Sequence, residues 1–274
     1  MAKKEKTPRP GTIAYTADRH EYYEKAVQCV ESEIDMVAET YENLRGKKAR
    51  FLREDFCGTG NTSCEWVRRH PKNTAIGLDL DQEVLDWGRQ NKIAALSPKQ
   101  QARISLINQN VLSANCPPAD VILAMNFSYQ LFKARDALLN YFKQAREGLA
   151  DDGVFFIDAY GGHESYRQIK EKTSFDDFDY YWHQKKYNPI TGHMLCHIHF
   201  KFKDKSWLKK AFTYDWRLWT LPEIQELLEE AGFSKVQVYW EGTDKKTGEG
   251  NGEYFPTNEG EDDPSWIVYV VSEK

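Results

Sequence analysis

A glycine-containing turn between a short strand and a helix constrains this chain more than any other feature of its sequence. Residues 49–55 read as a strand, residues 62–69 read as a helix, and Gly58 and Gly60 lie in the turn between them. Glycine adopts positive φ without steric cost and lets a ligand approach the backbone, and the start of the following helix favours an anion. Thr62, with a glutamate three residues later, predicts a capping box at that helix start. The segment is typical of a nucleotide-binding turn.

The remainder of the first 160 residues alternates short apolar runs with amphipathic helical patterns. Strands are predicted at 74–79, 104–108, 120–125 and 153–158, with helices at 82–92 and 138–149. This βαβα order predicts an α/β fold with a doubly wound, mostly parallel sheet. Before the first strand, residues 19–44 carry apolar side chains at three- and four-residue spacing and predict one or two helices, whereas residues 1–12 predict a disordered tail.

The pattern changes after residue 161 and predicts an antiparallel β insertion at 175–219. Its three expected strands, separated by turn-forming segments, are 178–187, 193–203 and 207–218. The chain then returns to a helix that begins with the capping box Thr220-Leu-Pro-Glu223 and stops at Gly232. Two last strands are expected at 236–240 and 266–271, joined by an acidic, glycine-rich loop over 241–264.

Composition narrows the class of protein. A chain of 274 residues, 41% of them hydrophobic, can bury one sizeable core, so a single domain is predicted at 13–274. The formal net charge of -5, with no basic stripe, argues against a nucleic-acid partner. No apolar run reaches the ~20 residues that span a bilayer and no signal peptide begins the chain, so no membrane partner and a cytoplasmic location are expected. The five cysteines are scattered, so neither disulfides nor a zinc site are predicted.

An acidic residue after the second strand indicates which ligand the turn would hold. Asp79 lies nineteen residues after Gly60, where a carboxylate can accept both hydroxyls of a ribose. The spacing Gly58-x-Gly60-x-x-Ser63 is also a loose dinucleotide fingerprint, so NAD is an alternative. Glu54, inside the strand of the turn, would repel a pyrophosphate but hold the α-ammonium of a methionine moiety. The sequence therefore favours S-adenosyl-L-methionine as cofactor.

The run Glu54-Asp-Phe-Cys-Gly-Thr-Gly60 resembles the first motif of class I S-adenosylmethionine-dependent methyltransferases, with Phe56 in place of the first glycine. The resemblance covers about residues 49–274, and bacterial members share an Arg-Glu-Asp-Phe-Cys-Gly-Thr run. It implies a Rossmann-like, seven-stranded sheet with an antiparallel last strand. It also implies that the amino-terminal helices, residues 13–48, form a lid over the cofactor.

The same resemblance implies which residues contact the cofactor. Asp79 would bind the ribose, and Asn110 would stand where the family usually has an aspartate beside the adenine. The full set expected at the cofactor is Tyr23, Glu54, Phe56, Gly58, Thr59, Gly60, Asp79, Leu80, Asn110, Val111 and Asn126.

The residues after the fourth and fifth strands would face the methyl acceptor, because ligands of such folds bind beyond the carboxyl ends of the strands. Asn126-Phe-Ser-Tyr129 faintly resembles the Asn-Pro-Pro-Tyr motif of amino-methylating enzymes. Tyr129 and His163 are candidate catalytic residues that could accept or relay a proton. The alternatives are a strand end packed in the core and a solvated loop histidine. His197 and His199 alternate onto one strand face, but they lack partners at ligand spacing, so no metal is predicted.

The leading hypothesis is methyl transfer from S-adenosylmethionine to a small-molecule acceptor, by N- or O-methylation. Its support is the aromatic insertion, which resembles the substrate lids and dimer-forming sheets of small-molecule methyltransferases, so a homodimer is also possible. Three alternatives remain open: a protein or RNA methyltransferase, an NAD-dependent oxidoreductase, and a non-catalytic S-adenosylmethionine-binding protein.

Overall fold

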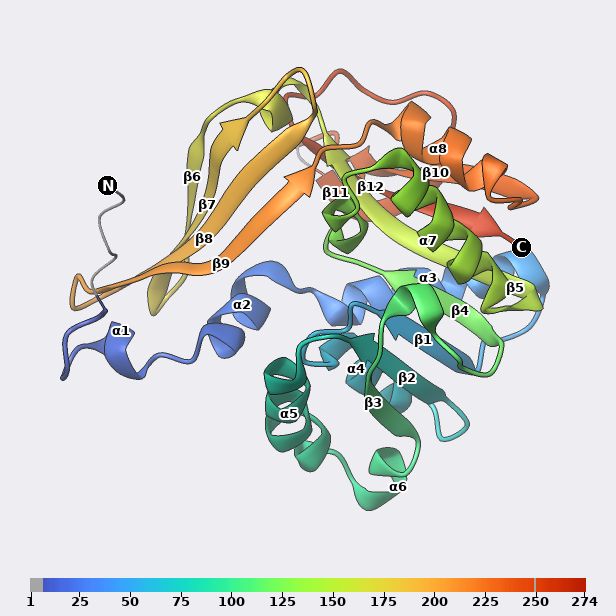
Figure 1. Ribbon diagram of the computed structural model, residues 1–274, viewed down its shortest axis with the longest axis horizontal. Helices are drawn as coiled ribbons and strands as arrows, with labels where there is room; N and C mark the ends of the chain where they lie inside the picture. Colours follow the sequence, from blue (N-terminus) through green and yellow to red (C-terminus); the bar gives the residue numbers. More distant parts are fainter. Residues whose placement is uncertain (1–6, 249) are drawn as a thin grey trace. The chain divides into compact units, whose positions relative to one another are not determined.

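The computed structural model describes residues 7–248 and 250–274, which form two compact units (Figure 1). The larger unit comprises residues 30–162 and 219–274, and the smaller unit comprises residues up to 29 together with residues 163–218. Each unit has its own sheet. Of the predicted disordered tail, residues 1–6 lie outside the described residues, and residues 7–12 lead into the first helix.

The larger unit is built on an eight-stranded sheet in the order β11-β10-β12-β5-β4-β1-β2-β3. Its strands are β1 (Phe51–Asp55), β2 (Thr74–Asp79), β3 (Ile104–Asn108), β4 (Ala119–Ala124), β5 (Leu149–Gly161), β10 (Lys235–Thr243), β11 (Gly250–Thr257) and β12 (Trp266–Glu273). The first five strands are parallel, whereas β12 runs antiparallel between β5 and β10. The predicted α/β fold with a mostly parallel sheet and a reversed last strand is confirmed.

The sheet has one strand more than the seven that were predicted. Strand β11 lies in the acidic, glycine-rich segment that was expected to be a loop, and it pairs antiparallel with β10. Trp240 faces Phe255 across this pair, and the backbone N–H of Gly252 donates to the Glu241 side chain. Glycine and glutamate have low intrinsic strand propensity, so the pairing with an existing edge strand decides the conformation here.

Helices cover both faces of this sheet. On one face lie α3 (Val30–Arg45) and α4 (Asn61–Arg69), and on the other lie α7 (Arg135–Glu147) and α8 (Leu221–Glu230). The unit also contains α5 (Gln82–Asn91) and four shorter elements: η1 (Ile93–Ala95), α6 (Pro98–Gln101), η2 (Val111–Ser113) and η3 (Ser128–Leu131). The long aromatic side chains of α7 and β5 fill the core on the α7 face, where Phe142 and Phe155 are fully buried.

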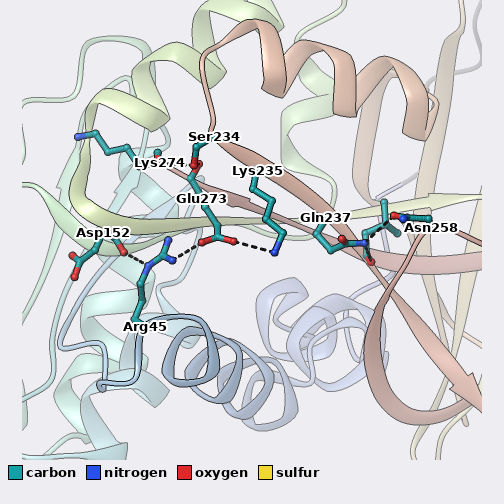
Figure 2. A network of polar contacts seen from close by, with 9 residues as sticks. Arg45, Asp152, Ser234, Lys235, Gln237, Asn258, Glu273 and Lys274 are labelled. Carbon is teal, nitrogen blue, oxygen red and sulfur yellow. Dashed lines mark hydrogen bonds and ion pairs between the residues drawn. The ribbon is translucent and has the colours of Figure 1, made fainter.

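An arginine at the end of α3 ties this helix to the sheet (Figure 2). Arg45 donates from Nε to the Asp152 backbone carbonyl over 2.7 Å and forms an ion pair with Glu273 at the end of β12. Lys235 at the start of β10 lies 3.5 Å from the same glutamate. These contacts hold the end of α3 where the parallel strands begin, opposite the carboxyl ends of the strands, where a ligand would bind.

A buried ion pair lies inside β1. Arg53 and Asp55 are two residues apart, so their side chains project from the same face of the strand, and they form two hydrogen bonds of 2.7 and 2.8 Å. The Tyr141 hydroxyl of α7 donates to the same carboxylate over 3.0 Å. Gly148 leaves room for this guanidinium, because a Cβ there would lie 2.2 Å from Nη1 of Arg53. Sequence analysis did not predict this pair.

The smaller unit contains a four-stranded antiparallel sheet in the order β6-β7-β8-β9. Its elements are α1 (Ile13–Thr16), α2 (Arg19–Val27), η4 (His163–Tyr166), β6 (Lys170–Ser174), β7 (Phe178–Tyr187), β8 (His193–Phe202) and β9 (Trp207–Arg217). Strand β6 was not among the three predicted strands, because its sequence Lys-Glu-Lys-Thr-Ser is polar and exposed along its whole length. Tyr22 of α2 packs against Phe178 and Phe202, with ring centroids 4.9 and 5.0 Å apart.

Candidate functional site

The turn that follows β1 is held in a left-handed conformation. Phe56, Gly58 and Gly60 have φ of 57°, 53° and 70°. The backbone N–H of Gly58 donates to Oδ2 of Asp79 over 2.9 Å, which joins the turn to the carboxyl end of β2. A Cβ on Gly58 would meet only one side-chain carbon, of Val84 at 3.9 Å, so the space beside this glycine is open. The turn can therefore admit a ligand close to the Gly58 backbone.

Gly60 has a different role from Gly58. A Cβ on Gly60 would lie 2.6 Å from the Leu106 side chain of β3, so this glycine is required for packing as well as for its positive φ. Gly88 of α5 likewise lies against the Thr59 carbonyl, 2.2 Å from where a Cβ would stand. The turn is consequently packed against its neighbours around Gly60, and the open space lies beside Gly58.

The predicted capping box at the start of α4 is wrong. The helix begins at Asn61, one residue earlier than expected, and Gly60 is its N-cap without a side-chain hydrogen bond. Glu54 of β1 supplies the missing acceptor, because its Oε2 accepts from the Ser63 backbone N–H over 2.9 Å and from the Ser63 hydroxyl over 2.5 Å. The predicted partner Glu65 instead pairs with arginines in the last turn of the helix. An acid from a neighbouring strand therefore caps α4.

Burial changes the charge state of Glu54. Its side chain is only 7% exposed, and this desolvation raises its pKa to about 7. The hydrogen bonds from Ser63 and Thr62 act in the opposite direction, whereas the nearby charge of Glu33 on α3 raises the pKa further. A cation bound beside these acids would favour their ionised form.

Further predicted residues follow β2 and β3, at the carboxyl ends of the parallel strands. Asp79 accepts the Asp81 backbone N–H through Oδ1 over 2.9 Å, so each of its oxygens orders a segment of backbone. Leu80 follows it and is 65% exposed, which places an apolar surface beside the acid. After β3, Asn110 accepts the Leu112 N–H over 2.9 Å and so caps η2, while Val111 is buried.

The loop after β4 is held by an acid within β5, three residues before the end of that strand. Asp158 accepts the backbone N–H groups of Asn126 and Phe127, each over 2.8 Å. Both of these loop residues have positive φ, 58° and 57°. Burial raises the pKa of Asp158 to about 7. Sequence analysis placed the residues after β4 and β5 near an acceptor but did not predict that one of them holds the other.

The predicted catalytic residues lie in different surroundings. Tyr129 is fully buried in the core beside Phe142, and this burial raises the pKa of its hydroxyl well above the usual range. His163 is exposed in η4 of the smaller unit. Tyr23, predicted to contact the cofactor, packs on Phe212 in the smaller unit at 4.8 Å between ring centroids. Their roles stay predictions, and only Tyr129 shares a unit with the glycine turn.

Two further features concern metals and membranes. His183 and His199 approach to 3.3 Å between ring nitrogens in the smaller unit. Over residues 7–248 and 250–274, however, no three histidine, cysteine or acidic side chains are grouped as metal ligands would be. In the same ranges, no helix is long and apolar enough to cross a bilayer.

The larger unit therefore brings ten of the eleven predicted cofactor residues to the carboxyl ends of β1, β2, β3 and β4. Sequence analysis placed Asp158 near the acceptor but missed that it holds the loop after β4, and it missed Glu33, whose charge acts on Glu54 and Asp158. An acid at a strand end next to the loop of a neighbouring strand was the available signal for Asp158. Glu33 lies within an amphipathic helix, where nothing in the sequence distinguishes it from solvated glutamates.

Comparison with known proteins bears on the fold. No family model and no curated protein matches this sequence. Among solved structures, a S-adenosylmethionine-dependent methyltransferase from Clostridium acetobutylicum aligns with a TM-score of 0.66 and 17% identity, covering 93% of this chain and 96% of the other. CalS10, an amino pentose methyltransferase from Micromonospora echinaspora, aligns at 0.65 and 14% over 93% and 96%. The sugar N-methyltransferase KedS8 from Streptoalloteichus aligns at 0.61 and 13% over 100% and 99%. The chain shares its fold with these methyltransferases.

Proposed function

We propose that this protein is an S-adenosylmethionine-dependent methyltransferase that acts on a small-molecule acceptor. The observation that carries the proposal is the open turn at Gly58, held by Asp79 from the neighbouring strand end. This arrangement leaves a backbone approach and a carboxylate side by side, as an adenosine with a free ribose requires. The shared fold with methyltransferases of the same length supports it.

The residues at the carboxyl ends of the parallel strands fit the cofactor. The two oxygens of Asp79 each accept one backbone N–H, and a carboxylate has about four acceptor sites, so capacity remains for the ribose hydroxyls. Exposed Leu80 and the Asn110 amide would lie along the adenine, and Gly58 and Thr59 along the methionine moiety. When bound, the cofactor supplies a methyl group already activated on a sulfonium. What remains for the protein is to hold acceptor and donor in line, which can contribute roughly 7–11 kcal/mol.

For the acceptor we propose an amine, and among amines an amino sugar. Glu33, Glu54 and Asp158 interact electrostatically within the larger unit, and such a group of acids favours cations over anions. The amino pentose and sugar N-methylating enzymes among the structural neighbours support this class of acceptor. O-methylation of a sugar hydroxyl is the second candidate. His163 and Tyr129 stay the proposed proton-handling residues, and a homodimer through the aromatic sheet stays a proposal.

The alternatives have weaker support. A dinucleotide-binding sheet in the order 3-2-1-4-5-6 is parallel throughout, whereas here β12 is inserted in reverse between β5 and β10. Glu54 also points its carboxylate at the start of α4, where a pyrophosphate would need to bind. A protein or RNA substrate would need a recognition surface that the acidic charge balance does not favour.

Calorimetric titration with S-adenosylmethionine, S-adenosylhomocysteine and NAD tests the cofactor. We expect micromolar binding of the first two and none of NAD; binding of NAD alone would overturn the proposal. The acceptor is then tested with methyl-labelled S-adenosylmethionine and two sets of sugars, one carrying free amines and a matched set with hydroxyls at the same positions. Label in the amine set supports N-methylation, and label only in the hydroxyl set replaces it with O-methylation. A non-catalytic protein would bind the cofactor and label neither set.

A further inference from the structure

We infer that Asp158 is a positioning residue, which fixes the backbone of Asn126 and Phe127 so that the Asn126 side chain is presented to the cofactor. The inference rests on the proposed function, because it assigns Asp158 a role in that same site. Its basis is a single carboxylate that binds two successive backbone N–H groups of a loop from the neighbouring strand.

The loop conformation needs such an anchor. Asn126 and Phe127 both have left-handed φ, 58° and 57°, which asparagine tolerates but phenylalanine disfavours. Successive N–H groups in this kind of conformation form a concave anion-binding arrangement. Here the anion is the side chain of Asp158, which is 8% exposed. Without it, two partly buried donors would lose their acceptor in a backbone conformation that these residues do not favour on their own.

Other contacts hold the rest of the loop, and they do not involve the Asn126 side-chain amide. The Ser128 hydroxyl donates to the Met125 carbonyl over 2.8 Å, and the Phe127 ring lies 4.8 Å from that of Tyr160. In contrast, the side-chain amide of Asn126 makes no hydrogen bond to any residue that the structure describes. The loop is therefore held at Asn126, Phe127 and Ser128, and the Asn126 amide is the group able to donate to and accept from a ligand.

The charges around Asp158 come from several elements. Glu33 of α3 raises its pKa, and Asp158 in turn raises the pKa of Tyr129 at the end of the loop and of Tyr254 on β11. The two loop N–H groups favour the ionised form of its carboxylate. Loop geometry and the charge of Asp158 are thus mutually dependent.

A matched control exists at the other end of the same sheet. Asp120, on β4, also accepts two successive backbone N–H groups, those of Arg50 and Phe51, over 2.7 and 2.9 Å. This carboxylate holds the start of β1, far along the strand from the glycine turn. Both contacts of Asp120 are to its Oδ2, whereas Asp158 uses Oδ2 for Asn126 and Oδ1 for Phe127. Asp120→Asn therefore makes the same chemical change outside the proposed site and can keep its one accepting oxygen, whereas Asp158→Asn must lose one of its two.

The first measurement is amide hydrogen exchange by mass spectrometry on the full chain. In Asp158→Asn, an amide NH₂ replaces one acceptor oxygen and faces a backbone donor, so we expect exchange of residues 126–128 to rise at least tenfold. In Asp120→Asn, where the amide oxygen can accept both N–H groups, any rise should be smaller and confined to residues 50–52. Unchanged protection of the 126–128 segment in Asp158→Asn would overturn the inference, whatever the protein binds.

The second measurement is a double-mutant cycle on the affinity for S-adenosylhomocysteine. Asn126→Gly removes the amide and keeps positive φ accessible. We expect each of Asp158→Asn and Asn126→Gly to weaken binding about tenfold, and the double variant about tenfold rather than a hundredfold, because both changes remove one interaction. Asp120→Asn should bind like the wild type.

Each result decides a different claim. A hundredfold loss in the double variant, or normal binding by Asp158→Asn, would overturn the positioning role while the proposed function stands. A wild-type protein that binds no S-adenosylhomocysteine would overturn the proposed function and the cofactor role of Asn126 with it. Equal losses of affinity in Asp158→Asn and Asp120→Asn would also overturn the positioning role, because the effect would then reflect the general stability of the protein.

Discussion

At the scale of single residues, three acidic side chains have the same structural role. Glu54 at β1, Asp79 at β2 and Asp158 at β5 each lie at or near a strand end and accept backbone N–H groups from a loop or helix start. A carboxyl group has two oxygens and can accept two such N–H groups at once, most strongly when it is ionised. Three short side chains therefore order the loops at the ligand edge of the sheet, where regular strand pairing has ended.

Asp79→Ala tests the proposed ribose contact. The substitution should weaken S-adenosylmethionine binding at least tenfold, because it removes a charge-assisted contact of about 1.5–3 kcal/mol. Asp81→Ala is the matched control: Asp81 caps α5 by accepting the Glu83 and Val84 N–H groups, so its loss should cost about 1 kcal/mol of stability and leave affinity unchanged. Calorimetry on both variants checks this, and unchanged affinity in Asp79→Ala would move the ribose elsewhere.

Gly58→Ala separates ligand approach from backbone strain. Gly58 and Gly46 both have positive φ, 53° and 65°, and neither would crowd a Cβ, so alanine should cost each about 1 kcal/mol of unfolding free energy. Only Gly58→Ala should weaken cofactor binding, because only its Cβ would enter the proposed site. Gly60 is less informative, since its Cβ would collide with Leu106 at 2.6 Å. Equal affinities of the two alanine variants would exclude the open turn as the binding surface.

At the scale of elements, the core strand β1 can hold two charged side chains because Arg53 and Asp55 form a buried ion pair. Arg53→Met should lower the free energy of unfolding by about 3–5 kcal/mol, because Asp55 would be left charged and buried. Glu230→Gln is the control: its ion pair with Arg135 is about half exposed to solvent, so its loss should change the free energy of unfolding far less than Arg53→Met does. Urea unfolding of both variants gives the comparison. Similar losses would mean that the pair in β1 is no more important than one in solvent.

Elements with strong periodicity could be predicted from the sequence, and elements decided by pairing could not. The bounds of β2, β3 and β7 agree with the prediction to the residue, since each is an apolar or aromatic run between turn signals. Strands β6 and β11 carry polar residues or glycine and form because an adjacent edge accepts them. The capping of α4 failed for a related reason, because the acceptor comes from β1 and not from the helix itself.

At the scale of the whole molecule, the candidate site was predictable where chemistry is local in sequence. The glycine turn and Asp79 could be placed because a strand, a turn and the next strand follow one another along the chain. The anchoring of Asn126 by Asp158 spans 32 residues, and the approach of Glu33 to both buried acids depends on how α3 packs on the sheet. Such contacts arise from tertiary packing, so a local pattern does not contain them.

The buried acids also predict how stability of the cofactor-free protein depends on pH. The pKa values of Glu54 and Asp158 are each raised to about 7, whereas unfolded glutamate and aspartate titrate near 4. Between about pH 4 and 7 the native state therefore binds more protons than the unfolded state, and the free energy of unfolding falls as pH rises. Each group contributes a slope of up to about 1.4 kcal/mol per pH unit in that range.

Urea unfolding between pH 5 and 8 measures this slope. Glu54→Gln and Asp158→Asn should each flatten it, because an amide does not titrate, whatever they do to stability at a single pH. Cofactor affinity should change in the opposite direction and rise with pH over the same range, since the ionised acids attract a sulfonium and an α-ammonium. A pH slope that is the same in the wild type and in both amide variants would show that these acids are ionised in the fold over this range, and would remove the electrostatic argument for a cationic ligand.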